Sequence, residues 1–331
     1  MTTMLKRIVL TTILLSAGAF SQVPVADHHQ HVFSPAMAEF QKIKRITAAD
    51  VIKDLDQAGI NRGVLLSTAY SYGRPGREPQ NEYAKVKEEN DWVAAQAALY
   101  PKRLIAFCGF NPLKDYALAE LDRCAKNPRT RRGIKLHFGN ADVQMEDPAQ
   151  MAKLKAVFRA ANTNRMAIVV HLRASFTLDR PYGADQARAF LEQLLPIATD
   201  IPIQIAHLGS AGPGYDDPKV DAFMDALIDG LKGKVIGDSS SSQNPKAKIQ
   251  NATNLWFDLT TNVHPEDKPE RWAMIQKRIR QIGAKRILYG SDAPLGDNLK
   301  PVAAWAAIVA KLGLTQDELK TIASNRAPYF K

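Results

Sequence analysis

The amino-acid sequence predicts a single (β/α)8 TIM barrel, and two observations carry that prediction. Short apolar, β-branched runs alternate along the chain with longer segments of helical period, a pattern typical of βα units around a parallel sheet. Eight such runs follow one another, which favours a closed barrel over an open sheet in a chain of 331 residues. No internal repeat and no linker divides the sequence, so we expect one domain over residues 22–331.

The eight predicted strands are separated by intervals long enough for a helix. They cover residues 25–33, 63–68, 104–110, 133–138, 167–172, 201–208, 255–260 and 286–291. The final segment, residues 301–331, predicts helices that pack against the outside of the barrel. Residues 233–244 predict a surface loop before the seventh strand.

The helices show start and stop signals. Thr47 offers a hydroxyl N-cap, and Asp50 follows three residues later. The helix that they begin carries an apolar stripe and ends at Gly59. A long helix with a polar face is predicted over residues 81–99, and another over residues 186–195, each ending close to a proline.

The N-terminus resembles a cleavable export signal. Lys6 and Arg7 precede an apolar run at residues 8–15, and small residues follow up to Ser21. This order is typical of a secretory signal peptide, and the run is too short to span a bilayer. An ordinary buried first helix is the alternative. We expect residues 1–21 to be removed, the protein to be periplasmic or secreted, and no stable membrane insertion after cleavage.

Charge and cysteine content narrow the partners. Without Lys6 and Arg7 the formal net charge falls from +10 to +8, with 42 basic against 34 acidic side chains, a balance that attracts anionic substrates. The sequence contains no block of basic residues interleaved with aromatics, so nucleic acid is not an expected partner.

Export permits a disulfide between Cys108 and Cys124, but the apolar run around Cys108 favours a small buried hydrophobe. The sequence leaves the oligomeric state open, a homo-oligomer included.

Histidines gather where a barrel places its chemistry. His29 and His31 are two apart on the first strand and share a face, whereas His28 is expected to point outward as a structural residue. Further polar residues stand at the ends of later strands: His137, His171, His207 and Asp292. Barrel enzymes build their sites at the carboxyl ends of the strands, so we expect these side chains to converge.

These motifs together resemble a known superfamily. Asp27-x-His29-x-His31, the fifth-strand His171, Ala206-His207-Leu208-Gly209 and Gly290-Ser291-Asp292 are similar to the motifs of the metal-dependent amidohydrolases. The closest resemblance is to the amidohydrolase-2 branch, which contains decarboxylases, lactonases and hydrolases of carboxylated substrates. It covers nearly the whole mature chain and implies an amidohydrolase-like TIM-barrel domain. It also implies that His29, His31, His171 and Asp292 hold a divalent metal, with His207 beside it facing the substrate.

The residue types agree with that chemistry. Imidazoles and one carboxylate suit a single Zn²⁺, with Mn²⁺ as the alternative. A metal with an open position lowers the pKa of bound water to about 7. Asp292 can then ligate weakly and accept the proton, while His207 polarises a carbonyl or protonates a leaving group. We therefore predict Asp292 and His207 as catalytic residues.

Two residues of the fourth strand are predicted to face the barrel interior. Lys135 and His137 alternate with apolar neighbours, so both are candidate substrate contacts. In two-metal relatives of the superfamily a lysine at this strand is carboxylated and bridges the ions, but the branch that this chain resembles works with one metal. An ion pair of Lys135 in the barrel interior, with Asp27 or another nearby aspartate or glutamate, is the alternative.

Loops after the strands are predicted to recognise the substrate. Tyr72, Arg74 and Arg77 follow the second strand, and Arg173 follows His171 by two residues. Guanidinium groups match carboxylates bidentately, so we expect a small carboxylated molecule as substrate. The alternative for Arg74 and Arg77 is a solvated or ion-paired loop charge.

The predicted activity is metal-dependent hydrolysis of an ester, lactone or amide bond. Non-oxidative decarboxylation of an aromatic or unsaturated carboxylic acid is the alternative, because the same ligand set supports both reactions. Export favours hydrolysis. A metal-binding or substrate-binding barrel without catalysis is the third reading, and the full set of predicted ligands argues against it.

Overall fold

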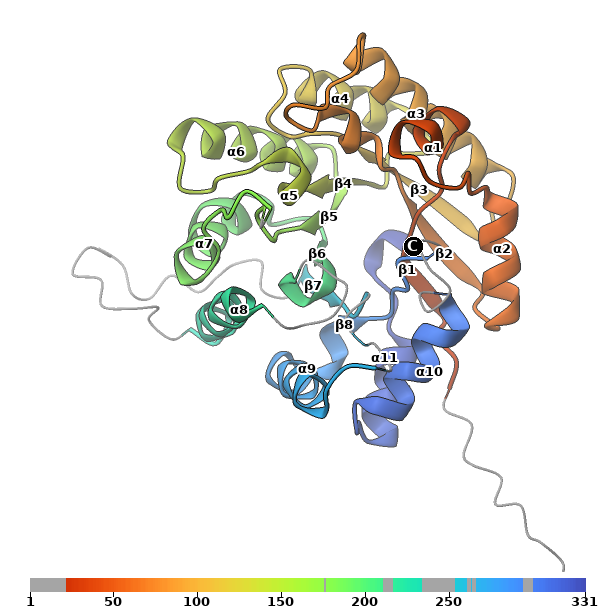
Figure 1. The fold of residues 1–331 in the computed structure, drawn as a ribbon, viewed down its shortest axis with the longest axis vertical. Coiled ribbons are helices and arrows are strands. Elements are labelled where there is room, and N and C mark those ends of the chain that lie inside the picture. Colours follow the sequence, from red (N-terminus) through yellow and green to blue (C-terminus); the bar gives the residue numbers. More distant parts are fainter. Residues whose placement is uncertain are drawn as a thin grey trace, which may run out of the picture.

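The chain forms an eight-stranded parallel barrel surrounded by helices (Figure 1). The computed structural model describes residues 22–175, 177–210, 217–233, 254–260, 263, 266–293 and 300–331. The strands follow in the order β1 to β8, and main-chain hydrogen bonds join the two edges. The Asp292 amide donates to the His29 carbonyl (2.8 Å), and the His28 amide donates to the Tyr289 carbonyl (3.0 Å). The predicted fold class is confirmed.

All eight predicted strands are present, and each is shorter than predicted. They are β1 Ala26–Gln30, β2 Arg62–Leu66, β3 Leu104–Gly109, β4 Gly133–His137, β5 Ala167–His171, β6 Ile203–Ile205, β7 Leu255–Asp258 and β8 Ile287–Leu288. The largest reduction is in β6, because the chain turns into a 3-10 segment at Ala206–Gly209. There His207 and Leu208 have positive φ values of 55° and 49°, which a strand cannot accommodate.

Helices follow the strands and form the outer ring in Figure 1. They are α1 Pro35–Gln41, α2 Ala48–Gln57, α3 Glu82–Ala98, α4 Ala117–Lys126, α5 Phe138–Ala141, α6 Pro148–Thr163, α7 Ala184–Ala189, α8 Pro218–Leu231, α9 Pro269–Ile282, α10 Pro301–Lys311 and α11 Gln316–Ser324. The predicted cap of α2 is a complete capping box, in which Thr47 and Asp50 satisfy each other's main-chain amides. The helix predicted over residues 186–195 is α7 followed by a π-helical turn at Phe190–Leu194.

The barrel interior has its own apolar layer, separate from the layer between sheet and helices. Strand residues such as Val64, Phe107 and Val169 pack there against Tyr329 and Phe330. The prediction that all of residues 301–331 pack outside is therefore wrong for the last few residues. Alanine, tyrosine and phenylalanine at 327, 329 and 330 close the base of the barrel because their apolar area is buried there.

His28 also differs from its prediction. Its ring lies 5.3 Å from that of Phe330 and 6.1 Å from that of Tyr329, so it packs against the C-terminal segment rather than outward. The pairing of β1 with β2 shifts register between Asp27 and Gln30, as at a β-bulge. Such a shift interrupts strict alternation, which allows His28 and His29 both to face the interior.

Cys108 and Cys124 form a disulfide that joins β3 to α4, with both residues 1% exposed. The interpretation of Cys108 as an unpaired buried hydrophobe is therefore wrong. The strand and the following helix pack closely enough to bring the two Cα atoms to 6.4 Å, within the range for a disulfide.

Some predictions fall on residues outside the described ranges. These are the signal peptide at residues 1–21 and nearly all of the loop at 233–244. Among the described residues, no helix combines the length and the apolar character needed to cross a membrane.

Candidate metal centre

The predicted metal ligands and His207 lie at or just beyond the carboxyl ends of the strands. His29 and His31 come from β1 and the residue after it, and His171 ends β5. His207 and Asp292 follow β6 and β8 in left-handed main-chain conformations, with φ values of 55° and 61°. Non-glycine residues adopt such conformations at a cost, and they persist where the surrounding contacts hold them, often at functional sites.

Three imidazole rings are oriented by hydrogen bonds from Nδ1. His31 Nδ1 lies 2.7 Å from the Leu66 carbonyl oxygen, His207 Nδ1 3.0 Å from the Thr260 carbonyl oxygen, and His29 Nδ1 3.0 Å from Asp258 Oδ2. Because these oxygens only accept, each Nδ1 carries the hydrogen. In the neutral ring Nε2 then presents a lone pair to the site. Metal-binding histidines are oriented in this way.

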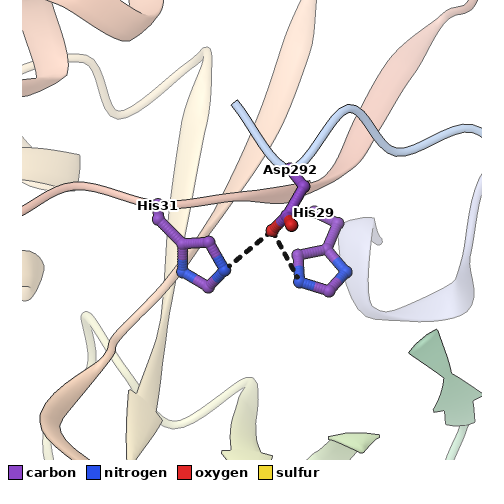
Figure 2. Close-up of side chains that lie close together, drawn as sticks. All are labelled: His29, His31 and Asp292. Carbon is purple, nitrogen blue, oxygen red and sulfur yellow. Dashed lines mark ion pairs between the residues drawn. The ribbon is translucent and has the colours of Figure 1, made fainter. Parts of the chain in front are cut away.

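Two of these Nε2 atoms face a single carboxylate oxygen. Asp292 Oδ1 lies 3.1 Å from His31 Nε2 and 3.5 Å from His29 Nε2, and Figure 2 shows both rings directed toward it. The ligand atoms of His29, His31 and Asp292 all lie within 4.8 Å of one another. Lone pairs facing one another at these distances repel unless a cation lies between them, so the donor set fits a divalent metal.

Burial and neighbouring groups set the protonation states of two of these residues. Burial, together with the neighbouring Lys135 ammonium, lowers the pKa of His29 to about 3. Burial alone would raise the pKa of Asp292, but the contact with His31 and the nearby His29 hold it well below its usual range, because a proton on either Nε2 would take the place of the cation. A neutral imidazole and an ionised carboxylate are the forms that bind a metal.

Asp258, at the end of β7, organises the site from behind, and the sequence analysis missed it. Its Oδ2 accepts from His29 Nδ1 and from Gln204 Nε2 (2.6 Å), and its Oδ1 accepts from the main-chain amide of His207 (2.8 Å). Burial opposes its ionisation, yet the attraction and hydrogen bond from the His29 Nδ1–H keep its pKa below the ordinary value. An acidic residue inside a predicted buried strand was the available signal.

Lys135 contacts a predicted ligand. Its Nζ lies 3.1 Å from His29 Nε2, in the buried interior, and burial lowers the pKa of Lys135 to about 8. The alternative pairing with Asp27 is not formed, because Asp27 accepts from the amides of His29 and Ser291 and from the Gln30 side chain. One lone pair on His29 Nε2 cannot serve both the ammonium and a metal, so the two cations compete for it.

His171 and His137 stack face to face, with ring centroids 3.8 Å apart and planes 16° apart. His171 lies outside the group of three close ligands, although its ring is 5.1 Å from that of His207. Its Nδ1 is buried and has no hydrogen-bond partner among the described residues. His137 Nδ1 accepts the Asn140 amide (3.1 Å), so its neutral ring carries the hydrogen on Nε2 and is a donor there.

A cavity of about 230 Å³ adjoins these histidines. Three of the predicted substrate contacts line it: Arg74, His137 and Arg173. Arg173 is held within the protein, because its guanidinium donates twice to Asp217 Oδ2 (2.8 and 2.5 Å) and lies 4.8 Å from the Tyr182 ring centroid. Arg74 has no ion pair in the part of the chain that the structure describes.

Two predicted contacts lie away from this cavity. Arg77 lies over the Phe40 ring at 5.8 Å, and the buried Tyr72 ring packs against the same phenylalanine at 4.8 Å. Neither is among the residues that line the cavity. Glu78 and Glu82, which follow the loop arginines in the sequence, pair with Lys114.

Comparison with known proteins places this geometry in context. Residues 26–325 match the family model Amidohydro_2, described as amidohydrolase. Among curated proteins, no sequence matches the chain.

Solved structures share the fold at low sequence identity. A 2,6-dihydroxybenzoate decarboxylase from Rhizobium has a TM-score of 0.61 and 16% identity, covering 91% of this chain and 96% of its own. A 5-carboxyvanillate decarboxylase from Novosphingobium aromaticivorans, with bound manganese, has a TM-score of 0.61 and 15% identity over 95% and 98% of the chains. A probable 2-pyrone-4,6-dicarboxylic acid hydrolase from Acinetobacter baumannii has a TM-score of 0.54 and 18% identity over 90% and 95%.

Proposed function

Because this chain belongs to the amidohydrolase-2 family, we propose that it is a divalent-metal-dependent hydrolase of a small carboxylated substrate, cleaving an ester, lactone or amide bond. The observation that carries the proposal is the convergence of His29 Nε2 and His31 Nε2 on Asp292 Oδ1, with both rings fixed through Nδ1. Donor atoms oriented in this way fit a metal ion.

His29, His31 and Asp292 would hold the ion, and His171 would complete the set. The Nδ1 of His171, which has no hydrogen-bond partner among the described residues, supports its inclusion, because buried polar atoms without a partner are rare in proteins. Zn²⁺ is our first choice and Mn²⁺ the alternative, since imidazole and carboxylate ligands suit both. When bound, the ion supplies a Lewis acid and activates water at neutral pH.

Asp292 and His207 would handle the protons. The ionised Asp292 can accept a proton from water at the centre, because its other contacts are to imidazoles rather than to acids. His207 presents Nε2 to the site while its Nδ1–H is held by the Thr260 carbonyl. It is therefore placed to take a proton and return it to a leaving group.

Arg74 and His137 would recognise the substrate. Both line the cavity of about 230 Å³ beside the centre, and Arg74 has no ion pair with a described residue. A guanidinium without a carboxylate partner matches a substrate carboxylate. His137 Nε2–H is a donor of fixed tautomer for a carbonyl or hydroxyl oxygen. Arg173 would shape the wall, because Asp217 already occupies its guanidinium.

Non-oxidative decarboxylation is the second candidate. It is favoured by two neighbours in fold that are decarboxylases of substituted benzoic acids. The third neighbour, a hydrolase named for a dicarboxylic acid, favours the first candidate. In both reactions the substrate carries a carboxylate, so the proposed role of Arg74 is common to them.

One assay separates the two reactions. The purified protein, with its metal and after chelation, is incubated with lactones, esters, amides and aromatic acids, and both acid release and CO₂ release are measured. Chelator-sensitive acid release, restored by Zn²⁺ or Mn²⁺, is the expected result. CO₂ release from the aromatic acids would replace the hydrolase proposal with the decarboxylase. No metal-dependent turnover of any substrate would favour a binding barrel.

We also propose that the protein is exported after cleavage near Ser21. The N-terminal sequence supports this, and so does the buried disulfide between Cys108 and Cys124, since disulfides persist mainly in oxidising compartments. Mass spectrometry of the protein from the periplasmic fraction should give a mature N-terminus near residue 22. Recovery of the intact chain from the cytoplasm would contradict export.

A further inference from the structure

A second cavity, of about 500 Å³, lies at the opposite end of the barrel from the metal centre. Arg132 immediately precedes β4, Arg165 precedes β5, and Pro202 precedes β6, so the cavity lies beneath the amino ends of these strands. Tyr329 and Lys331 from the C-terminal segment form another part of its wall. Its volume is in the range of small-molecule sites.

The cavity concentrates positive charge without side-chain neutralisation. Arg131, Arg132, Arg165 and Lys331 line it, and no aspartate or glutamate is among its lining residues. None of the three arginines forms an ion pair with an aspartate or glutamate side chain of a described residue. Arg132 is positioned by main-chain oxygens, donating to the Tyr329 carbonyl at 2.9 Å and to the oxygen of Lys331.

The positive field extends beyond the lining residues. Arg62 donates to the Phe330 carbonyl oxygen at 3.0 Å, next to the same C-terminal segment. Its own burial, and the like charges of Arg326 and Arg132, lower its pKa below the ordinary value. Like charges crowded at one end of the barrel repel one another, so an anion bound among them would relieve that repulsion.

We propose that this basal cavity is a binding site for a small anion carrying at least two negative charges on phosphate or carboxylate oxygens. Guanidinium groups bind both kinds of oxyanion in bidentate fashion, and the asparagine at 164 adds an uncharged polar group to the wall. The site is distinct from the proposed substrate cavity, which opens at the carboxyl ends of the strands around Arg74 and His137.

The test is calorimetric titration of the metal-loaded, full-length protein with inorganic phosphate and, separately, with succinate, at constant ionic strength. The variant Arg131→Gln/Arg165→Gln removes two exposed charges from the cavity. We expect at least one of the two anions to bind the wild type, and the double variant to bind it at least tenfold more weakly. The two titrations separate a phosphate site from a carboxylate site.

Two controls exclude other sources of binding. Arg129→Gln/Arg159→Gln removes the same charge from exposed positions that do not line the cavity, and it should leave the affinity unchanged. His31→Ala disrupts the metal centre and should also leave anion binding unchanged. An equal loss in the first control would assign binding to net charge, and a loss in the second would assign it to the metal. Either result overturns the proposal, as does the absence of binding by both anions.

Discussion

The two ends of the barrel differ in which groups contact their basic side chains. At the carboxyl end, Asp258 and Asp292 stand among the histidines, and each carboxylate contacts at least one imidazole nitrogen. At the base, arginines meet main-chain carbonyl oxygens instead. The same barrel therefore offers one end suited to hold a cation and another suited to hold an anion. Carboxylate placement makes the difference, because among the described residues aspartates stand at the carboxyl end and no aspartate or glutamate lines the basal cavity.

A relay of buried hydrogen bonds connects the two ends. The Tyr329 hydroxyl donates to Gln204 Oε1 (2.6 Å), and Gln204 Nε2 donates to Asp258 Oδ2 (2.6 Å). The same carboxylate oxygen accepts from His29 Nδ1 (3.0 Å). Tyr329 also lines the basal cavity, so one side chain belongs to both regions.

The largest effect is expected for Asp292→Asn. The amide cannot accept the proton that we assign to the carboxylate, so turnover should fall by ~10³-fold. The amide oxygen can still ligate weakly, so part of the metal should remain. Turnover measured together with elemental analysis of the purified variant checks both statements. Retained turnover would remove Asp292 from its catalytic role.

Substitutions at two adjacent histidines of β1 should distinguish the roles of the two ends of the barrel. His29→Ala removes a proposed ligand and should weaken metal binding by at least ~100-fold, beyond the loss typical of outer-shell changes. His28→Asn alters a buried ring that packs on Phe330, so it should lower the melting temperature and keep the metal. Metal content and thermal melts of both variants are the measurements. Unchanged metal occupancy in His29→Ala would contradict the ligand assignment.

Two arginines of one loop provide a matched pair for substrate recognition. Arg74→Gln should raise KM by ~10-fold or more, because a hydrogen bond to a charged group contributes about 1.5–3 kcal/mol. Arg77→Gln removes the same charge from a side chain that lies over Phe40, and its KM should stay near the wild-type value. Steady-state kinetics on the substrate found in the assay distinguish them. Equal increases of KM in both variants would mean that substrate binding depends on the positive charge of the loop and not on Arg74 itself.

The smallest effect is expected for Tyr329→Phe, which breaks the relay at its base. Gln204 Oε1 loses its donor, so the free energy of unfolding should fall by about 1–2 kcal/mol. A purely structural role predicts no more than that. A role in positioning His29 also predicts a fewfold weaker metal affinity, measured by competition with a chelating dye. Unchanged metal affinity would show that the relay does not couple the base of the barrel to the metal centre.

The sequence predicted the barrel because its signals are local. Hydrophobic runs, the Thr47 cap and the glycine after α2 act within a few residues, so they could be recognised without a structure. His29 and His31 share a strand face for the same reason. Their convergence with Asp292 followed from the rule that the ends of parallel strands gather at one face.

Other features depended on contacts between distant segments. The inward position of His28 required the register shift in β1 and the burial of Phe330, which is about 300 residues away in the sequence. The disulfide depended on how closely α4 packs on β3. Asp258 was missed because an acidic residue in a strand acquires a role only when His29, Gln204 and His207 are seen around it.

The sequence by itself determined the fold class, the order of its elements and the kinds of side chain at the strand ends, since periodicity and capping are written in neighbouring residues. Only the tertiary structure decided which nitrogen of His29, His31 and His207 faces the centre, which loop arginine forms no ion pair with a described residue, and which end of the barrel gathers arginines without aspartate or glutamate among the described lining residues. These properties depend on hydrogen-bond and ion-pair partners from other strands and helices, and folding alone brings such partners together.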